Sequence, residues 1–171
     1  MKEKGVFLLK IETNIKPIEA IKVIHQAFKR YETDPQPSSA LSETENTIQN
    51  ELNQGTELFG VCDNNKLIGI VKCVLNNEYI YFSRLSVLPQ NQGKGIATSL
   101  VKYLEDYAMQ NNVFTSKCKV RKSEKYNIAL YLKLGYDIVK EEMIVNKNGD
   151  EIPTLTMSKN LNPKVVEVLN T

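Results

Sequence analysis

Two glycines, Gly93 and Gly95, alternate with polar residues in a segment, residues 90–97, that separates a strand-like stretch from an amphipathic helical one. Glycine lets the backbone adopt conformations closed to other residues and approach a ligand closely. At a helix N-terminus the first N–H groups lack intrahelical partners, and the helix dipole favours negative charge. Lys94 adds a positive charge. The segment predicts an anion-binding loop suited to a diphosphate.

Other phosphate motifs fit this segment poorly. A P-loop requires a further glycine, a lysine and a Ser/Thr in fixed order, and the dinucleotide fingerprint requires a third glycine where Thr98 stands. The alternative is that Gly93 and Gly95 only make a tight connection between strand and helix. The position of the loop after a strand and before an amphipathic helix favours the binding role.

Metal and disulfide chemistry is not expected. His25 is the only histidine and lies in a helical pattern, so a centre with several histidine ligands is excluded. Cys62, Cys73 and Cys118 are odd in number and widely spaced, which favours neither a disulfide framework nor a CxxC metal site. We interpret the three cysteines as small buried apolar residues.

The elements that position the loop follow from hydrophobic periodicity and turn residues. A strand is expected from Gly5 to Glu12, a helix from Pro17 to Tyr31, and a second helix from a capping box at residues 42–45 to about Gly55. Strands are then expected at 58–62, 67–75 and 79–88, a helix from about Gly95 to Ala108, a strand at 113–120, a helix at 124–134 with Gly135 as its cap, and a hairpin of 138–145 and 151–157.

This order predicts an α/β domain with a mainly antiparallel sheet and one strand–loop–helix–strand crossover. No repeat or linker divides the chain, so residues 1–160 are expected to form one domain, followed by a short tail, 161–171.

Composition excludes several partners. The 171 residues are 42% hydrophobic and 25% charged, with a net charge of +2 and no basic stripe, so nucleic acid is not expected. No apolar run is long enough to span a membrane, and the N-terminus lacks a signal-peptide pattern. We expect a cytoplasmic protein, as a monomer or a homodimer.

Two blocks resemble one known family. Residues 84–97 are similar to motif A of the GNAT family of N-acetyltransferases, and residues 127–136 are similar to its motif B. The resemblance implies a mixed, mostly antiparallel sheet of about seven strands flanked by about four helices. It also implies acetyl-CoA as cosubstrate, no metal, and a primary amine of a small molecule as acceptor. Short segments around Ser38 and Ser86 resemble polyamine-type members.

The resemblance also implies which residues hold the coenzyme. A strand edge would bind the pantetheine arm and the loop amides would bind the pyrophosphate. Family members often have asparagine where Glu124 stands, so Asn127 or Ser123 is expected to supply a polar contact instead, and Glu124 is not expected to contact the coenzyme. The expected coenzyme-binding residues are Leu85, Ser86, Val87, Gln92, Gly93, Lys94, Gly95, Ile96, Ala97, Thr98 and Asn127.

For catalysis, Tyr131 matches the family's general acid, and a phenol with a pKa of about 10 stays protonated at neutral pH. A backbone N–H near Leu85 to Val87 would stabilise the oxyanion. Glu78 is a candidate base acting through water, with a solvated carboxylate at a strand end as the alternative.

Acidic residues cluster between the first two helices, which would suit a cationic amine such as a polyamine; two of them would equally favour a helix N-terminus. This cluster comprises Glu32, Asp34, Glu43 and Glu45. Two other functions stay open: acetylation of a protein lysine or N-terminus, and a non-catalytic sensor of acyl-CoA.

Overall fold

The computed structural model describes residues 9–162, and its single sheet of seven strands has the order β1-β2-β3-β4-β5-β7-β6. Only β4 and β5 pair in parallel; the other neighbours are antiparallel. The elements are β1 (Ile11–Glu12), α1 (Pro17–Phe28), α2 (Glu45–Asn53), β2 (Glu57–Asp63), β3 (Lys66–Leu75), β4 (Ile80–Val87), α3 (Ile96–Gln110), β5 (Thr115–Arg121), α4 (Lys125–Lys133), β6 (Asp137–Val145) and β7 (Glu151–Asn160).

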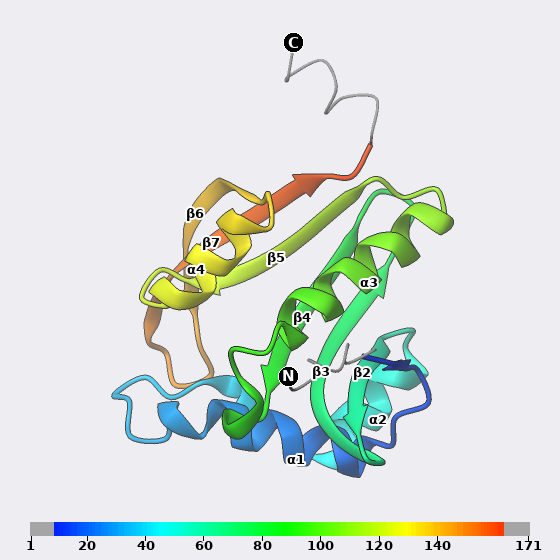
Figure 1. Ribbon diagram of the computed structural model, residues 1–171. Coiled ribbons are helices and arrows are strands. Elements are labelled where there is room, and N and C mark those ends of the chain that lie inside the picture. Colours follow the sequence, from blue (N-terminus) through cyan, green and yellow to red (C-terminus); the bar gives the residue numbers. More distant parts are fainter. Residues whose placement is uncertain (1–8, 163–171) are drawn as a thin grey trace, which may run out of the picture.

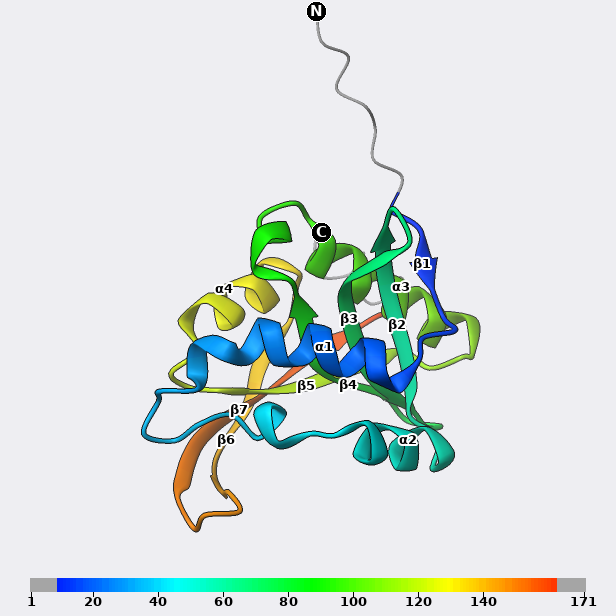
Figure 2. The same ribbon diagram turned by 90° about the horizontal axis from the view of Figure 1, so that it is seen from below.

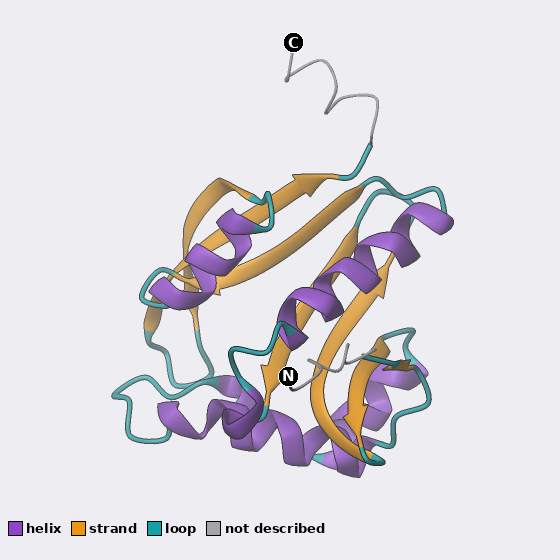
Figure 3. Ribbon diagram, in the orientation of Figure 1, coloured by secondary structure: helices purple, strands orange, loops and turns teal. Residues whose placement is uncertain are grey.

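The helices surround the sheet. In Figures 1 and 3, α3 and α4 lie in front of the strands and α2 lies behind them. Figure 2 shows α1 crossing the end of the molecule at which β4 and β5 separate. The expected mixed sheet with four flanking α-helices is therefore confirmed, together with the β4–α3–β5 crossover.

The apolar stripe of α3 forms the centre of the core. Leu100, Val101 and Leu104 are completely buried, since their spacing puts them on one face of the helix. Gly69 in β3 allows this close packing: a Cβ there would lie 2.6 Å from Cγ2 of Ile96. Each such side chain contributes about 1.5–3 kcal/mol when buried.

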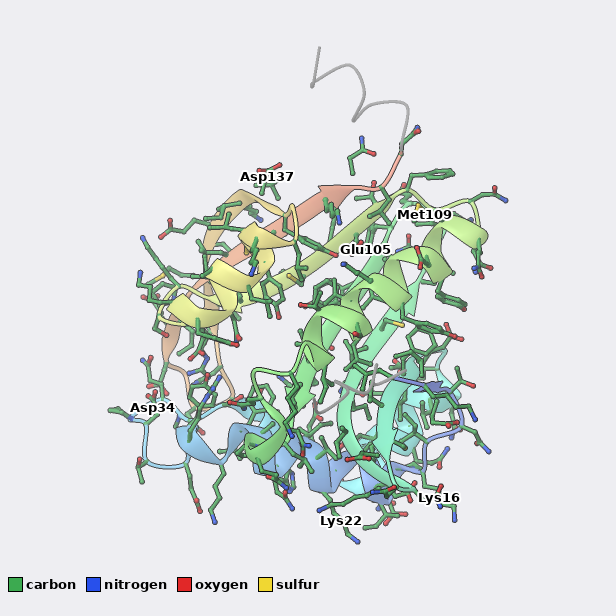
Figure 4. The ribbon with its side chains drawn as sticks, viewed as in Figure 1. Lys16, Lys22, Asp34, Glu105, Met109 and Asp137 are labelled. Atoms are coloured by element: carbon green, nitrogen blue, oxygen red, sulfur yellow. The ribbon has the colours of Figure 1, made fainter. Side chains whose placement is uncertain are left out.

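A buried polar cluster joins the two halves of the split sheet. Glu105, which Figure 4 shows on α3 facing β5, accepts hydrogen bonds from Tyr136 Oη (2.9 Å) and from Nζ of Lys159 in β7 (2.9 Å). Tyr136 Oη also lies 2.7 Å from Ser116 Oγ in β5. Because these buried groups satisfy one another, the cluster fixes α3 against β5 and β7.

Three details differ from the sequence-based expectations. The capping box of α2 is formed by Thr44 and Thr47, because Ser42 belongs to a 3₁₀ helix (Ser39–Ser42) and its hydroxyl donates to Ser39 O. The first helix ends at Phe28 and continues as a 3₁₀ turn to Tyr31. Residues 5–8 of the first expected strand, and the tail beyond 162, lie outside the described residues.

Candidate active site

The site begins where β4 and β5 separate. Their parallel pairing is confined to Ile80–Phe82 opposite Ser116–Cys118. Beyond Phe82 the two strands diverge, as Figure 1 shows, and the edge of β4 that faces β5 has no strand partner from Ser83 to Val87. An extended chain can therefore hydrogen-bond to this edge as an added strand would.

A bulge interrupts β4 at this point. The register against β3 shifts between Ser83 and Ser86, and Arg84 adopts a left-handed φ of +52°. This conformation costs a non-glycine residue roughly 1–2 kcal/mol. The bulge is held by Arg84 Nε, which lies 2.7 Å from Glu43 Oε1, and by Ser86 Oγ, which donates to the Arg84 carbonyl at 2.8 Å. Such locally strained backbone is frequent at functional sites.

The predicted anion-binding loop joins this strand to α3. Gly93 and Gly95 both have left-handed φ values, +76° and +79°, and nothing lies within 4 Å of a Cβ placed on either glycine. The backbone N–H groups from Gly93 to Thr98 donate to no other described residue, whereas the Ser99 N–H donates to Gly95 O at 3.0 Å. The loop therefore exposes consecutive unpaired donors at a helix N-terminus, as a diphosphate ligand requires.

A cavity of about 750 Å3 occupies the space between the diverging strands. Its walls come from the end of α1, the α1–α2 connection, β4, β5, α4 and the β6–β7 hairpin. A smaller cavity of about 60 Å3 lies between the end of α1, β4, the loop, the start of α3 and α4. Leu85 and Asn127 line both cavities, so they lie between the loop and the larger cavity.

The expected coenzyme-binding residues divide into three groups. Val87, Gln92 and Ala97 line the smaller cavity beside Leu85 and Asn127. Gly93, Lys94 and Gly95 are exposed in the loop, and together with Thr98 at the start of α3 they contribute unpaired backbone N–H donors. The side chains of Ser86 and Ile96 are buried, so only their backbones are available to a ligand.

Tyr131 lines the larger cavity from α4 and is 6% exposed. Its ring packs edge-to-face against Phe82, with centroids 5.6 Å apart. Its hydroxyl makes no hydrogen bond within residues 9–162, and the hydroxyl oxygen is not sealed from solvent. Burial, followed by the electrostatic effect of Cys118, raises the pKa of Tyr131, so the phenol keeps its proton throughout the neutral range.

Glu124 lines the larger cavity, although no role there was expected from the sequence. It is the N-cap residue of α4 and precedes Tyr131 by seven residues, two helical turns, so both lie on one face of α4 with Asn127. Among the described lining residues Glu124 is the only carboxylate. This spacing is visible in the sequence and could have identified it.

The Glu124 carboxylate is held from α1. The Tyr31 hydroxyl donates to Glu124 Oε2, and Arg30 Nη2 lies 3.7 Å from the same oxygen. Burial and this hydrogen bond raise the pKa of Tyr31 to about 12. Oε1 of Glu124 has no partner among residues 9–162 and is not sealed from solvent, so it is available to a ligand.

Glu78 does not reach the cavity. It lies in the exposed turn before β4, where its backbone N–H donates to Asn76 Oδ1 at 2.8 Å. The structure brings Tyr131 and Asn127 together at the cavity, but not Glu78.

The acidic cluster expected for a cationic amine does not line the cavity either. Figure 4 shows Asp34 at the outer edge of the α1–α2 connection. Glu43 is instead paired with Arg84 and with Lys72, whose Nζ also contacts Glu51 Oε2 at 2.6 Å. Local sequence could not anticipate these partners because they come from β3, β4 and α2.

The histidine and the cysteines have packing roles. His25 Nε2 contacts the Glu43 carbonyl at 2.9 Å. Cys73 and Cys118 are buried, which raises the pKa of each thiol to about 12, whereas Cys62 is only partly buried. Within the described residues no group of three His, Cys, Asp or Glu side chains is placed to bind a metal. The helices of this part of the chain are also too short or too polar to cross a membrane.

Comparison with known proteins agrees with this geometry. A search of curated proteins found no match to the sequence. Among solved structures, the ribosomal-protein-S18-alanine N-acetyltransferase of Escherichia coli is similar at a TM-score of 0.72 and 19% identity, over 90% of this chain and 94% of that one. An aminoglycoside 6'-N-acetyltransferase complexed with coenzyme A is similar at a TM-score of 0.68 and 16% identity, over 91% and 98%.

The IAA acetyltransferase of Bacillus cereus is similar at a TM-score of 0.67 and 18% identity, over 90% of this chain and 99% of that one. At these identities the similarity establishes the fold. The sequence profile described as "Acetyltransferase (GNAT) family" matches residues 21–136, which include the split strands, the loop and Tyr131. The chain therefore belongs to the acetyltransferase (GNAT) family.

Proposed function

We propose that this enzyme transfers the acetyl group of acetyl-CoA to a primary amine of a small molecule. The run of unpaired backbone donors from Gly93 to Thr98, which leads toward a cavity lined by Tyr131, is the observation that carries the proposal. The similar aminoglycoside acetyltransferase is described as a complex with coenzyme A, which supports the choice of cosubstrate.

The residues present suit the coenzyme. The loop would hold the pyrophosphate, and the free edge of β4 at Leu85 to Val87 would pair with the pantetheine amides. When bound, acetyl-CoA supplies a thioester whose carbonyl carbon is attacked by the amine nitrogen while the carbon–sulfur bond breaks. A backbone N–H at the β4 bulge would donate to the carbonyl oxygen as negative charge develops there.

Tyr131 would act as the general acid. Its hydroxyl is protonated and has no competing protein acceptor in the described structure, and Tyr131 lines the cavity. Donation of its proton to the departing sulfur would prevent release of a free thiolate. Because burial raises the pKa of Tyr131, the proton is present on the phenol when the carbon–sulfur bond breaks and negative charge develops on the sulfur.

Glu124 would bind the amine. An alkylamine is protonated at neutral pH and must lose a proton before it can attack. Oε1 of Glu124 can accept a hydrogen bond from the ammonium and take its proton, directly or through water. Glu78, the base suggested by sequence, lies in the exposed turn before β4 and does not line the cavity, so the proposal gives it no role.

Two alternatives remain open to test. Two similar structures are described as ribosomal-protein-alanine N-acetyltransferases, so a protein N-terminus is a second candidate acceptor. The α1–α2 connection and the β6–β7 hairpin both wall the cavity, which favours a small acceptor over a peptide. A non-catalytic acyl-CoA sensor would bind coenzyme without turnover.

The test combines binding with turnover. Acetyl-CoA should raise the melting temperature, because a ligand selective for the native state stabilises it. Release of free thiol from acetyl-CoA is then followed with small amines, amino acids and N-terminal peptides. No thermal shift would overturn the proposal; binding without turnover would support the sensor, and turnover of peptides alone would support the protein acceptor.

A further inference from the structure

The wall of the larger cavity carries more positive than negative charge. Four cationic side chains line it, Arg84, Lys119, Arg121 and Lys147, against the single carboxylate of Glu124. Whether this excess is available to a ligand depends on how far each charge is already neutralised by the protein.

Two of the charges on the wall are neutralised. Arg84 belongs to a cluster in which it and Lys72 contact Glu43, while Lys72 also contacts Glu51, so two cations face two carboxylates. The charge of Glu124 is balanced by Arg30, 3.7 Å from its Oε2, although its Oε1 can still accept a hydrogen bond from a ligand. These groups leave no net charge for a ligand.

Lys119 is only partly neutralised. Its Nζ lies 3.1 Å from Glu142 Oε1, but the same carboxylate also binds Lys140 Nζ at 2.9 Å through Oε2. One carboxylate therefore serves two ammonium groups, and this trio retains one positive charge.

Arg121 and Lys147 have no carboxylate partner in the described structure. Arg121, which is partly buried, donates from Nη1 to the Gln36 carbonyl and from Nη2 to the Pro37 carbonyl at 3.1 Å. A guanidinium has five N–H donors, so three of them remain unused, and backbone carbonyls do not cancel its charge. Lys147 lies exposed at the tip of the β6–β7 hairpin and makes no hydrogen bond or ion pair with any residue from 9 to 162.

The excess lies away from the coenzyme phosphates. Figure 2 shows the loop at residues 89–95 and the β6–β7 hairpin on opposite sides of α1. Lys147 stands on that hairpin, and the Arg121 side chain is bound to the α1–α2 connection. These cations therefore face the acceptor side of the cavity rather than the pyrophosphate loop.

We infer that the acceptor amine also carries an anionic group, a carboxylate or a phosphate, which Arg121 and Lys147 bind while Glu124 holds the ammonium group. This inference rests on the proposed acetyl transfer and specifies its substrate class. A guanidinium with unused N–H donors can donate to an anionic oxygen, and such charge-assisted hydrogen bonds are stronger than those between neutral groups. A polyamine, which would add only positive charge, is disfavoured by the same wall.

The experiment compares matched acceptors. Rates of acetylation are measured for ω-amino acids of two to six carbons and for alkylamines of equal length, with phosphoethanolamine against ethylamine as the phosphate arm. The anionic member of the best pair should have a kcat/KM higher by about tenfold or more, the factor expected for one charge-assisted contact. The arm with the larger ratio identifies the anionic group.

Variants then assign the preference. Arg121→Gln and Lys147→Gln should each reduce the ratio and together bring it near one; because both series are measured on the same variant, a general loss of activity cancels in the ratio. Lys147 has no contact to lose, so its variant remains informative if Arg121→Gln releases the α1–α2 connection. Lys125→Gln, at an exposed lysine outside the cavity wall, is the matched control and should keep the ratio.

Two outcomes would overturn the inference. Alkylamines acetylated as fast as their anionic partners, or variants that slow both series equally, would refute it and leave the acetyl transfer itself intact. Acetyl-CoA binding with no acetylation in either series would refute the proposed small-amine function, and the inference with it.

Discussion

Removal of the Tyr131 hydroxyl separates catalysis from stability. In Tyr131→Phe the ring contacts with Phe82 and Tyr136 remain, and no hydrogen bond to the described structure is lost. We therefore expect the free energy of unfolding to change by less than about 0.5 kcal/mol. Turnover should fall by about 10²-fold or more, since a general acid contributes roughly 10²–10⁴-fold. The affinity for acetyl-CoA should not change.

Tyr136→Phe is the matched control, because Tyr136 is a neighbouring buried tyrosine whose hydroxyl does make contacts. It bonds Glu105 Oε1 at 2.9 Å and Ser116 Oγ at 2.7 Å. Loss of these buried bonds should cost about 1–3 kcal/mol. Turnover per folded molecule should remain close to that of the natural enzyme.

The two variants are compared by urea unfolding, by thermal shift with acetyl-CoA, and by release of free thiol under saturating substrates. If Tyr131→Phe retained turnover within about twofold, the assignment of the general acid would be wrong. If it destabilised the protein as much as Tyr136→Phe, the Tyr131 hydroxyl would have a structural partner, and the reasoning from its unpaired state would fail.

Three further predictions concern the loop, the carboxylate and the thiols. Gly95→Ala and Gly55→Ala each place a Cβ in open space at a positive φ, so each should lower the free energy of unfolding by about 1–2 kcal/mol of strain. Only Gly95→Ala should also weaken the binding of acetyl-CoA. Equal coenzyme affinities of the two variants in calorimetry would contradict this. Glu124→Gln should lower kcat/KM for amines at neutral pH and recover part of it at higher pH, where the amine is already neutral; a pH profile parallel to that of the natural enzyme would exclude Glu124 as base. Burial raises the pKa of Cys73 and of Cys118 in the folded protein to about 12. The free energy of unfolding should therefore be independent of these thiols below about pH 9 and fall above it by about 1.4 kcal/mol per pH unit for each thiol, because only the unfolded chain loses these protons. In a Cys73→Ala, Cys118→Ala variant, the free energy of unfolding measured in urea should fall less steeply between about pH 8 and 10.5.

Local pattern was sufficient for most of the elements. The apolar spacing in residues 96–108 predicts α3, and turn residues mark the hairpins, because periodicity and turn chemistry are properties of neighbouring residues. The capping of α2 was assigned to the wrong residues, since Ser42 and Thr44 are both good caps and only the 3₁₀ turn before α2 decides between them.

Sequence by itself was enough to predict the loop with its two glycines and Tyr131 as a candidate acid, because each prediction depends on contiguous residues with a recognisable pattern. The tertiary structure alone decided which charged side chains line the cavity. Glu43 could not be excluded from the site until β3 and β4 supplied its partners, Lys72 and Arg84. Arg121 could not be included until β5 separated from β4 and opened the cavity. Electrostatic pairing is set by distance in space, and a sequence does not contain that distance.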